Sequence, residues 1–107
     1  MEKLINIISK EMLKKGKSLL SLGINEYVWN KDDIKEILEE LLEMKVGVLG
    51  GDVYKLEREN IKMTYDSWYI NDDNSETFYQ ISILKALKYI ENYEKNNCGD
   101  FLYSIVI

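Results

Sequence analysis

The sequence contains no histidine and no proline among its 107 residues, and it has a single cysteine, Cys98. Without histidine the chain lacks the commonest general base and metal ligand. One cysteine can form no intramolecular disulfide, which suits a reducing compartment, and no histidine is present to activate its thiol as a nucleophile. We therefore expect no catalytic centre of these kinds, no metal site and no cofactor.

Long apolar runs are also missing. No stretch approaches the roughly 18 apolar residues of a membrane span, and residues 1–15 contain no unbroken apolar segment typical of a secretion signal. The length favours one domain over residues 1–107. We expect a cytoplasmic protein that does not bind membranes.

Charge is unevenly distributed along the chain. The net charge is −5, but residues 1–17 carry five lysines against two glutamates, whereas the remaining residues carry nine basic against seventeen acidic side chains. An acidic body repels nucleic acid and attracts basic partners. The same charge is also explained by solubility alone, so composition leaves both interpretations open.

Two helices are predicted in the first half. The first occupies residues 4–15 and ends at Gly16 in a left-handed conformation; its apolar face holds Leu4, Ile5, Ile8 and Met12. The second begins after Asn30, a favourable N-cap. Its predicted buried stripe consists of Ile34, Ile37, Leu38, Leu41 and Leu42. Its outer face carries four acids, Glu36, Glu39, Glu40 and Glu43, which form either a solvated surface or a docking surface.

A β-hairpin is predicted from residues 46–56 and 61–70, both rich in β-branched and aromatic residues. A four-residue turn with Asn60 left-handed would give the pairs Leu56–Ile61, Tyr54–Met63, Asp52–Tyr65 and Leu49–Trp68. The face expected to meet the helices then carries Leu56, Ile61, Tyr54, Met63 and Tyr65. A slip of one residue would invert this assignment.

The glycine pair Gly50–Gly51 lies inside the first of these strands. The segment LGGD lacks the lysine and hydroxyl residue of a phosphate-binding loop, and no helix is predicted after it. The glycines therefore indicate close packing. The register places Trp68 diagonally across from Gly51, where an indole can cover the bare strand, and the Tyr65 hydroxyl near Asp52.

In the last third of the sequence, the pattern predicts a helix followed by a strand. Asp73 or Ser75 would cap the helix, and its buried arc would hold Phe78, Tyr79, Ser82, Ile83, Ala86, Tyr89, Ile90 and Tyr93. Residues 101–107 form an apolar run typical of a strand covered on both faces. The prediction is a small α+β domain, with an antiparallel sheet of the central hairpin and the C-terminal strand packed against about three helices.

The hairpin motifs resemble a known family. The segment GVLGGDVY (47–54), followed after a turn by TYDSWY (64–69), is similar to the immunity protein 40 family of bacterial polymorphic toxin systems. The similarity extends to SLLSLGINEYVW (18–29) and to the last helix and strand, so it covers nearly the whole chain beyond residue 15. One departure is Asn60, where the family often has glycine.

The resemblance implies a cytoplasmic protein, not an enzyme, that binds a cognate toxin domain and blocks it. Many such toxins are nucleases with basic clefts, which an acidic protein can occupy in place of nucleic acid. The motif residues Gly50, Gly51, Asp52, Tyr54, Tyr65, Asp66 and Trp68 form either the framework of the fold or a binding site. The candidate toxin-binding residues are the four α-helical glutamates Glu36, Glu39, Glu40 and Glu43, together with Tyr69, Asp72 and Asp73.

Two other functions remain open from sequence. The first is an enzyme or small-ligand protein with a pocket between hairpin and helices, using Asp52, Asp66 or Tyr65 as polar groups. The second is an adaptor domain that dimerises through an apolar helix stripe. An enclosed polar cavity lined by these three residues would favour the first alternative, and a filled core would favour the toxin-binding protein.

Overall fold

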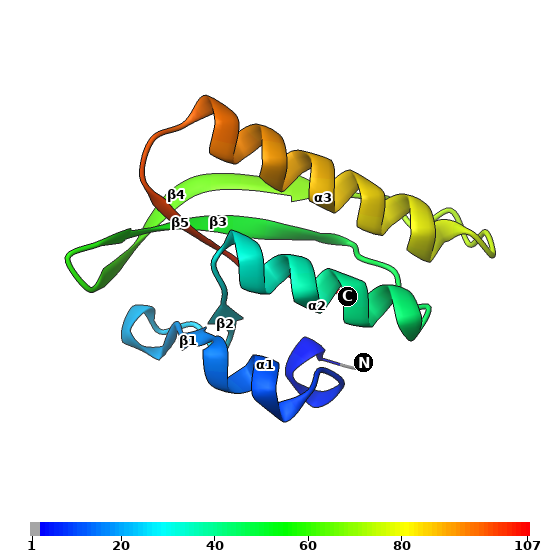
Figure 1. Cartoon of the computed structure of the whole chain (residues 1–107), viewed down its shortest axis with the longest axis horizontal. Coiled ribbons are helices and arrows are strands. Elements are labelled where there is room, and N and C mark those ends of the chain that lie inside the picture. The colour runs from blue at the N-terminus through cyan, green and yellow to red at the C-terminus, as the bar shows by residue number, and fades with distance from the viewer. Residues whose placement is uncertain (1–2) are drawn as a thin grey trace.

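The computed structural model describes residues 3–107 and confirms the α+β class (Figure 1). Its elements in chain order are η1 (Leu4–Asn6), α1 (Lys10–Lys15), β1 (Lys17–Ser18), η2 (Leu20–Leu22), β2 (Tyr27–Val28), α2 (Lys31–Glu43), β3 (Gly50–Glu57), β4 (Asn60–Tyr69), α3 (Phe78–Asn96) and β5 (Asp100–Tyr103), where η denotes a 3₁₀ turn.

The main sheet is antiparallel with strand order β4-β3-β5, so the hairpin and the C-terminal strand form it as expected. The short strands β1 and β2 form a separate pair. Just after β2, Trp29 and Tyr103 exchange backbone hydrogen bonds of 3.0 and 2.7 Å. The N-terminal third is thereby tied to the outer edge of β5.

The predicted first helix is divided. Ser9 interrupts it and becomes the N-cap of α1, accepting a hydrogen bond from the Met12 amide at 3.3 Å. Gly16 ends α1 in an extended conformation, with φ −76° and ψ 159°, and not in the expected left-handed one. This glycine is needed for space, because a β-carbon there would lie 2.8 Å from the Trp29 ring.

Helix α2 confirms the second prediction. The Asn30 side chain accepts a hydrogen bond from the Asp33 amide at 2.8 Å, as an N-cap does. Four of the five residues in the predicted stripe are fully buried: Ile34, Ile37, Leu38 and Leu41. Leu42 is 42% exposed, because it lies about 100° around the helix from Leu41 and falls outside the stripe.

The hairpin turn differs from the prediction. Arg58 and Glu59 form a two-residue loop with φ of 47° and 71°, whereas Asn60 belongs to β4. Two positive φ angles match the right-handed twist of the flanking strands. The predicted pairs Leu56–Ile61 and Tyr54–Met63 are nevertheless confirmed, because both turns place the same residues opposite each other.

A β-bulge then changes the register. Thr64, Tyr65 and Asp66 all lie opposite Val53, and Tyr65 has a φ of 66°. The Thr64 hydroxyl holds the bulge by donating to the Val53 carbonyl at 2.7 Å and accepting from the Asp66 amide at 3.1 Å. Beyond it Asp52 pairs with Ser67 and Gly51 with Trp68, so the predicted pairs Asp52–Tyr65 and Leu49–Trp68 are wrong.

The two faces of the main sheet are covered by different segments. Val53, Phe101 and Tyr103 point toward α2 and α3 and join the main core. Tyr54, Leu56 and Ile61 point the other way, where they pack with Leu19, Ile24, Val28 and Leu102. The predicted face therefore meets the β1–β2 segment and not the long helices. Met63 and Tyr65, assigned to the same face, are 42% and 88% exposed.

Helix α3 begins at Phe78 after Thr77, and neither Asp73 nor Ser75 caps it. The Asp73 side chain instead accepts a hydrogen bond from the Ser75 amide at 2.9 Å within the preceding loop. The predicted arc of α3 is confirmed, with Ser82 and Ala86 fully buried. The strand β5 is buried on both faces, as its apolar run predicts.

Candidate functional site

The glycine pair and Trp68 form one packing unit. Gly51 and Trp68 are direct cross-strand partners. A β-carbon on Gly51 would enter the space of the Trp68 ring and of the Ser104 carbonyl oxygen. The indole stacks in turn on Tyr89 of α3, with ring centroids 4.7 Å apart. The predicted packing of Trp68 on the glycine strand is confirmed, although Trp68 lies directly opposite Gly51 and not diagonally.

Other motif residues complete an aromatic layer between the sheet and α3. The Tyr93 hydroxyl donates to Asp66 at 2.8 Å, and its ring meets Phe101 edge-on with centroids 4.9 Å apart. The Tyr103 hydroxyl donates to Glu94 at 2.6 Å. Burial, and then the bonded carboxylate, raise the pKa of Tyr103 far above its ordinary value. The space between hairpin and α3 is thus filled with packed rings.

Part of the other sheet face is left open. Side chains alternate along a strand, so cross-strand neighbours share a face. In one row across the three strands, Gly50 pairs with Tyr69 on one side and with Val106 on the other. In the next row, Asp52 pairs with Ser67 and exchanges hydrogen bonds with Ser104. Tyr69 is 78% exposed and Val106 is 41% exposed. Ser104 itself is buried. We call Ser67, Tyr69, Asp52 and Val106 the open sheet face.

Two carboxylates repel each other beside this face. Glu26, just before β2, is half-buried, and this burial raises its pKa; the negative charge of Asp52 raises it further, while Lys3 acts in the opposite direction. Burial, followed by the charges of Asp52 and Glu26, also raises the pKa of Tyr54. Within residues 3–107, neither carboxylate makes a hydrogen bond or an ion pair. Sequence gave no signal for Glu26, because its neighbours come from other segments.

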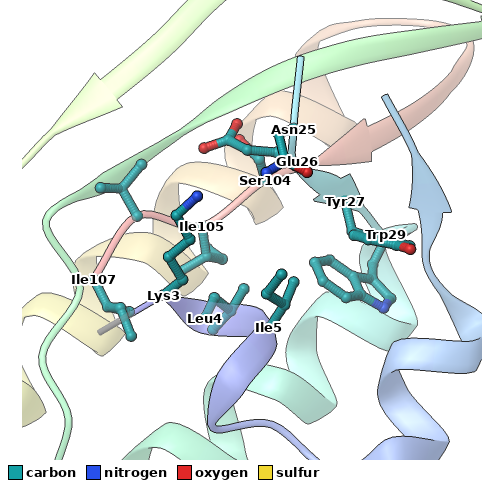
Figure 2. Close-up of a pocket in the computed structure, with 11 residues that line it drawn as sticks. Lys3, Leu4, Ile5, Asn25, Glu26, Tyr27, Trp29, Ser104, Ile105 and Ile107 are labelled. Carbon is teal, nitrogen blue, oxygen red and sulfur yellow. The ribbon is translucent and has the colours of Figure 1, made fainter. Parts of the chain in front are cut away.

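A hollow of about 200 Å³ adjoins the acid pair (Figure 2). Its walls are η1, the segment around β2 and the residues after β5, and Figure 2 shows Lys3 and Glu26 on its rim. The lining is mostly apolar and includes Leu4, Ile5, Tyr27, Trp29, Ile105 and Ile107. Asp52, Tyr65 and Asp66, the polar groups considered for a ligand pocket, do not line this hollow.

The predicted acidic stripe on α2 is divided between two environments. Glu40 accepts hydrogen bonds from the Ser9 amide at 3.0 Å and the Ser9 hydroxyl at 3.1 Å. Glu36 lies 3.7 Å from the Lys15 ammonium. Glu40 therefore bonds the start of α1 to α2, and Glu36 adds an ion pair at the surface. Glu36, Glu39 and Glu43 are exposed.

The remaining predicted residues, Asp72 and Asp73, lie in the exposed loop beyond Tyr69. Each accepts a hydrogen bond from a backbone amide two residues later, at 2.8 and 2.9 Å. Hydrogen bonds from Ser75 lower the pKa of Asp73. Both acids lie in an exposed loop that begins a few residues beyond the open sheet face.

Two further features concern metals and membranes. Among residues 3–107, no three histidine, cysteine, aspartate or glutamate side chains gather as the ligands of a metal ion would. In the same residues, no helix is both long and apolar enough to cross a bilayer.

A known protein family matches this sequence. The sequence model of the family described as Immunity protein 40 matches residues 18–107, which is most of the chain. No curated protein and no solved structure matches significantly. The matched region includes the hairpin with its glycine pair, α3 and the open sheet face, and it begins just after α1. The chain belongs to the immunity protein 40 family.

Proposed function

We propose that this protein binds a cognate bacterial toxin domain and neutralises it by covering its active or substrate-binding surface. The observation that carries the proposal is the family match over residues 18–107, since an immunity protein acts through a toxin partner. The proposed site of action is the cytoplasm, and the protein itself carries out no reaction.

The open sheet face is the best-supported docking surface. Binding energy concentrates in a few exposed aromatic or apolar anchors surrounded by polar groups. Tyr69 and Val106 are exposed on either side of buried Gly50, and Asp52 lies in the next row. Asp72 and Asp73 follow in the adjoining loop. The surface therefore offers apolar anchors within an acidic surround.

The acidic surround favours a basic toxin surface. Residues 18–107 carry a large excess of acidic over basic side chains, and complementary charge speeds association and selects partners more than it adds affinity. A nuclease fits this chemistry, because its cleft must attract phosphates. Glu39 and Glu43 of α2 remain a second predicted contact region, which a separate variant tests.

Co-expression tests the function. The toxin domain encoded beside this gene would be produced in bacteria with this protein, with the Tyr69→Ala variant, or with an empty vector. We expect the unaltered protein to restore growth and to purify as a stable complex with the toxin. The Tyr69→Ala variant should restore growth only when it is produced in much higher amounts, and the empty vector should not restore it. Growth arrest in the presence of the unaltered, soluble protein would contradict the proposal for that toxin.

The ligand-binding or enzymatic alternative receives no support from its nominated residues. Tyr65 is 88% exposed, Asp66 is bonded to Tyr93, and Asp52 lies on the opposite sheet face. The hollow of about 200 Å³ is smaller than typical small-molecule pockets, which occupy roughly 300–1,000 Å³. A second hollow, of about 380 Å³ beside β5, is not lined by any of the three nominated residues.

A further inference from the structure

We propose that the hollow between η1, β2 and the C-terminal residues receives an arginine side chain of the toxin, with Glu26 as its counter-ion. This inference rests on the proposed function, because it places an arginine of the toxin in the hollow beside the open sheet face. The hollow lies next to Val106, which belongs both to its lining and to that face.

The shape of the hollow suits a long side chain. Its volume of about 200 Å³ is too small for a typical cofactor, and its walls are apolar, with Leu4, Ile5 and Ile105 among them. An arginine buries its methylene stem along such walls while its charged end stays near the polar rim. Tyr27 also lines the hollow and is partly exposed, so it offers an aromatic face on which a guanidinium can stack.

The charge at the rim selects a cation. Glu26 is half-buried, close enough to Asp52 for their charges to oppose each other, and within residues 3–107 no side chain pairs with either carboxylate. A positive charge beside Glu26 would offset this repulsion. A guanidinium has five donors in a planar fork and bonds carboxylates in a bidentate manner, which an ammonium does not. The expected occupant is therefore arginine.

Lys3 provides an internal test of this charge argument. Its side chain lies on the same rim as Glu26 (Figure 2), and its positive charge partly offsets that of Glu26. An incoming guanidinium would be attracted by Glu26 and repelled by Lys3. Replacing these two residues should therefore change the binding of a cation in opposite directions.

The first experiment uses n-butylguanidinium as a probe of the hollow, without any toxin. Two-dimensional NMR of the ¹⁵N-labelled protein would follow the amides of residues 25–29 and 104–107 during titration. We expect saturable shifts confined to these segments. Glu26→Gln should weaken binding about fivefold, as for loss of a partly exposed ion pair, and Lys3→Ala should strengthen it. Glu91→Gln, an exposed acid of α3 that does not line the hollow, serves as the charge-matched control and should leave binding unchanged.

Three results would overturn the assignment. They are no saturable shift in the unaltered protein, an equal affinity in the Glu26→Gln and Lys3→Ala variants, or an equal affinity for n-butylammonium. The last result would show that the hollow does not select guanidinium.

The second experiment uses the cognate toxin and separates this inference from the proposed function. If the toxin binds the unaltered protein but binds Glu26→Gln equally well, the arginine assignment fails and the immunity function stands. If the toxin binds neither protein while n-butylguanidinium still binds, the immunity function fails for that toxin. A loss of affinity in Glu26→Gln that one toxin Arg→Ala variant reproduces, with no further loss when the two are combined, would support the assignment.

Discussion

The indole of Trp68 lies directly across the β3–β4 ladder from Gly51, in the space that a β-carbon at position 51 would enter. The Ser104 carbonyl closes the same space from β5. Because Gly51 has no side chain, the Trp68 ring and the Ser104 carbonyl can both pack against strand β3 at this position. Gly51 of the GGD segment and Trp68 of the YDSWY segment serve this packing, which leaves Asp52 and Tyr69 of the same segments on the opposite face.

Replacing Gly51 by valine should destabilise the protein by roughly 1–3 kcal/mol, because an overpacked site forces neighbouring groups to move. The backbone oxygen of Ser104 cannot rotate away as a side chain would. Urea unfolding of the variant measures the change. Ser67→Ala, an exposed change in β4, is the control and should stay within about 0.5 kcal/mol. An unaltered midpoint for Gly51→Val would remove the packing argument.

Glu40 and Glu39 are neighbours on α2 with different expected effects. Glu40→Ala removes the two hydrogen bonds to Ser9 and should lower the free energy of unfolding by about 1 kcal/mol. Glu39→Ala removes an exposed carboxylate and should change stability little. Both variants are compared by urea unfolding. Equal stabilities would mean that Glu40 does not hold α1 in place.

The stability of the protein should reflect the titration of Glu26. Its pKa is raised above the ordinary value of 4.5 by burial and then by Asp52, so the folded chain binds the proton more tightly than the unfolded chain. Glu26 therefore opposes folding once the pH rises through that window, and this effect is absent below the ordinary pKa. Glu26→Gln should be more stable than the unaltered protein near neutral pH.

The gain should shrink toward zero as the pH falls below the ordinary glutamate value. Unfolding free energies of both proteins across this range provide the measurement, with Glu39→Gln as an exposed control. A destabilised Glu26→Gln at neutral pH would show that the carboxylate makes a favourable contact in the folded protein.

The exposed part of the α2 stripe should influence association rates. A Glu39→Gln, Glu43→Gln double variant keeps the contacts of Glu36 and Glu40 intact. If this surface steers the toxin, association at low salt should slow, and raising the salt should matter less than for the unaltered protein. Stopped-flow measurements at two salt concentrations decide this. Identical rates at both would assign the stripe to solvation and to holding α1.

Local patterns predicted part of this fold correctly. Helix α2 followed from one N-cap and a regular apolar stripe, both of which lie within the element itself. The buried strand β5 followed from its unbroken apolar run. The pairs nearest the hairpin turn were correct because few residues separate them from it. In each case the residues that determine the element are close together in the sequence, so periodicity and capping signals are enough to predict it.

The errors arose where distant segments decide the conformation. The bulge at Thr64–Asp66 depends on a hydrogen bond to Val53 of the neighbouring strand, and it changed every pair beyond it. The predicted sheet face is wrong because the segment of the short strands β1 and β2, which the sequence pattern does not indicate, covers Tyr54. Glu26 was missed for the same reason, since Asp52 and the hollow come from elsewhere in the chain.

The most direct test of the account is the dissociation constant of the cognate toxin domain for this protein and for its Tyr69→Ala variant, measured by calorimetry. Tyr69 is the exposed aromatic anchor of the open sheet face, and loss of such an anchor typically weakens binding by about 2 kcal/mol or more. We predict at least roughly tenfold weaker binding for Tyr69→Ala, with Asn92→Ala, an exposed change on α3, within about twofold of the unaltered protein. Equal dissociation constants for Tyr69→Ala and the unaltered protein would contradict docking on this face.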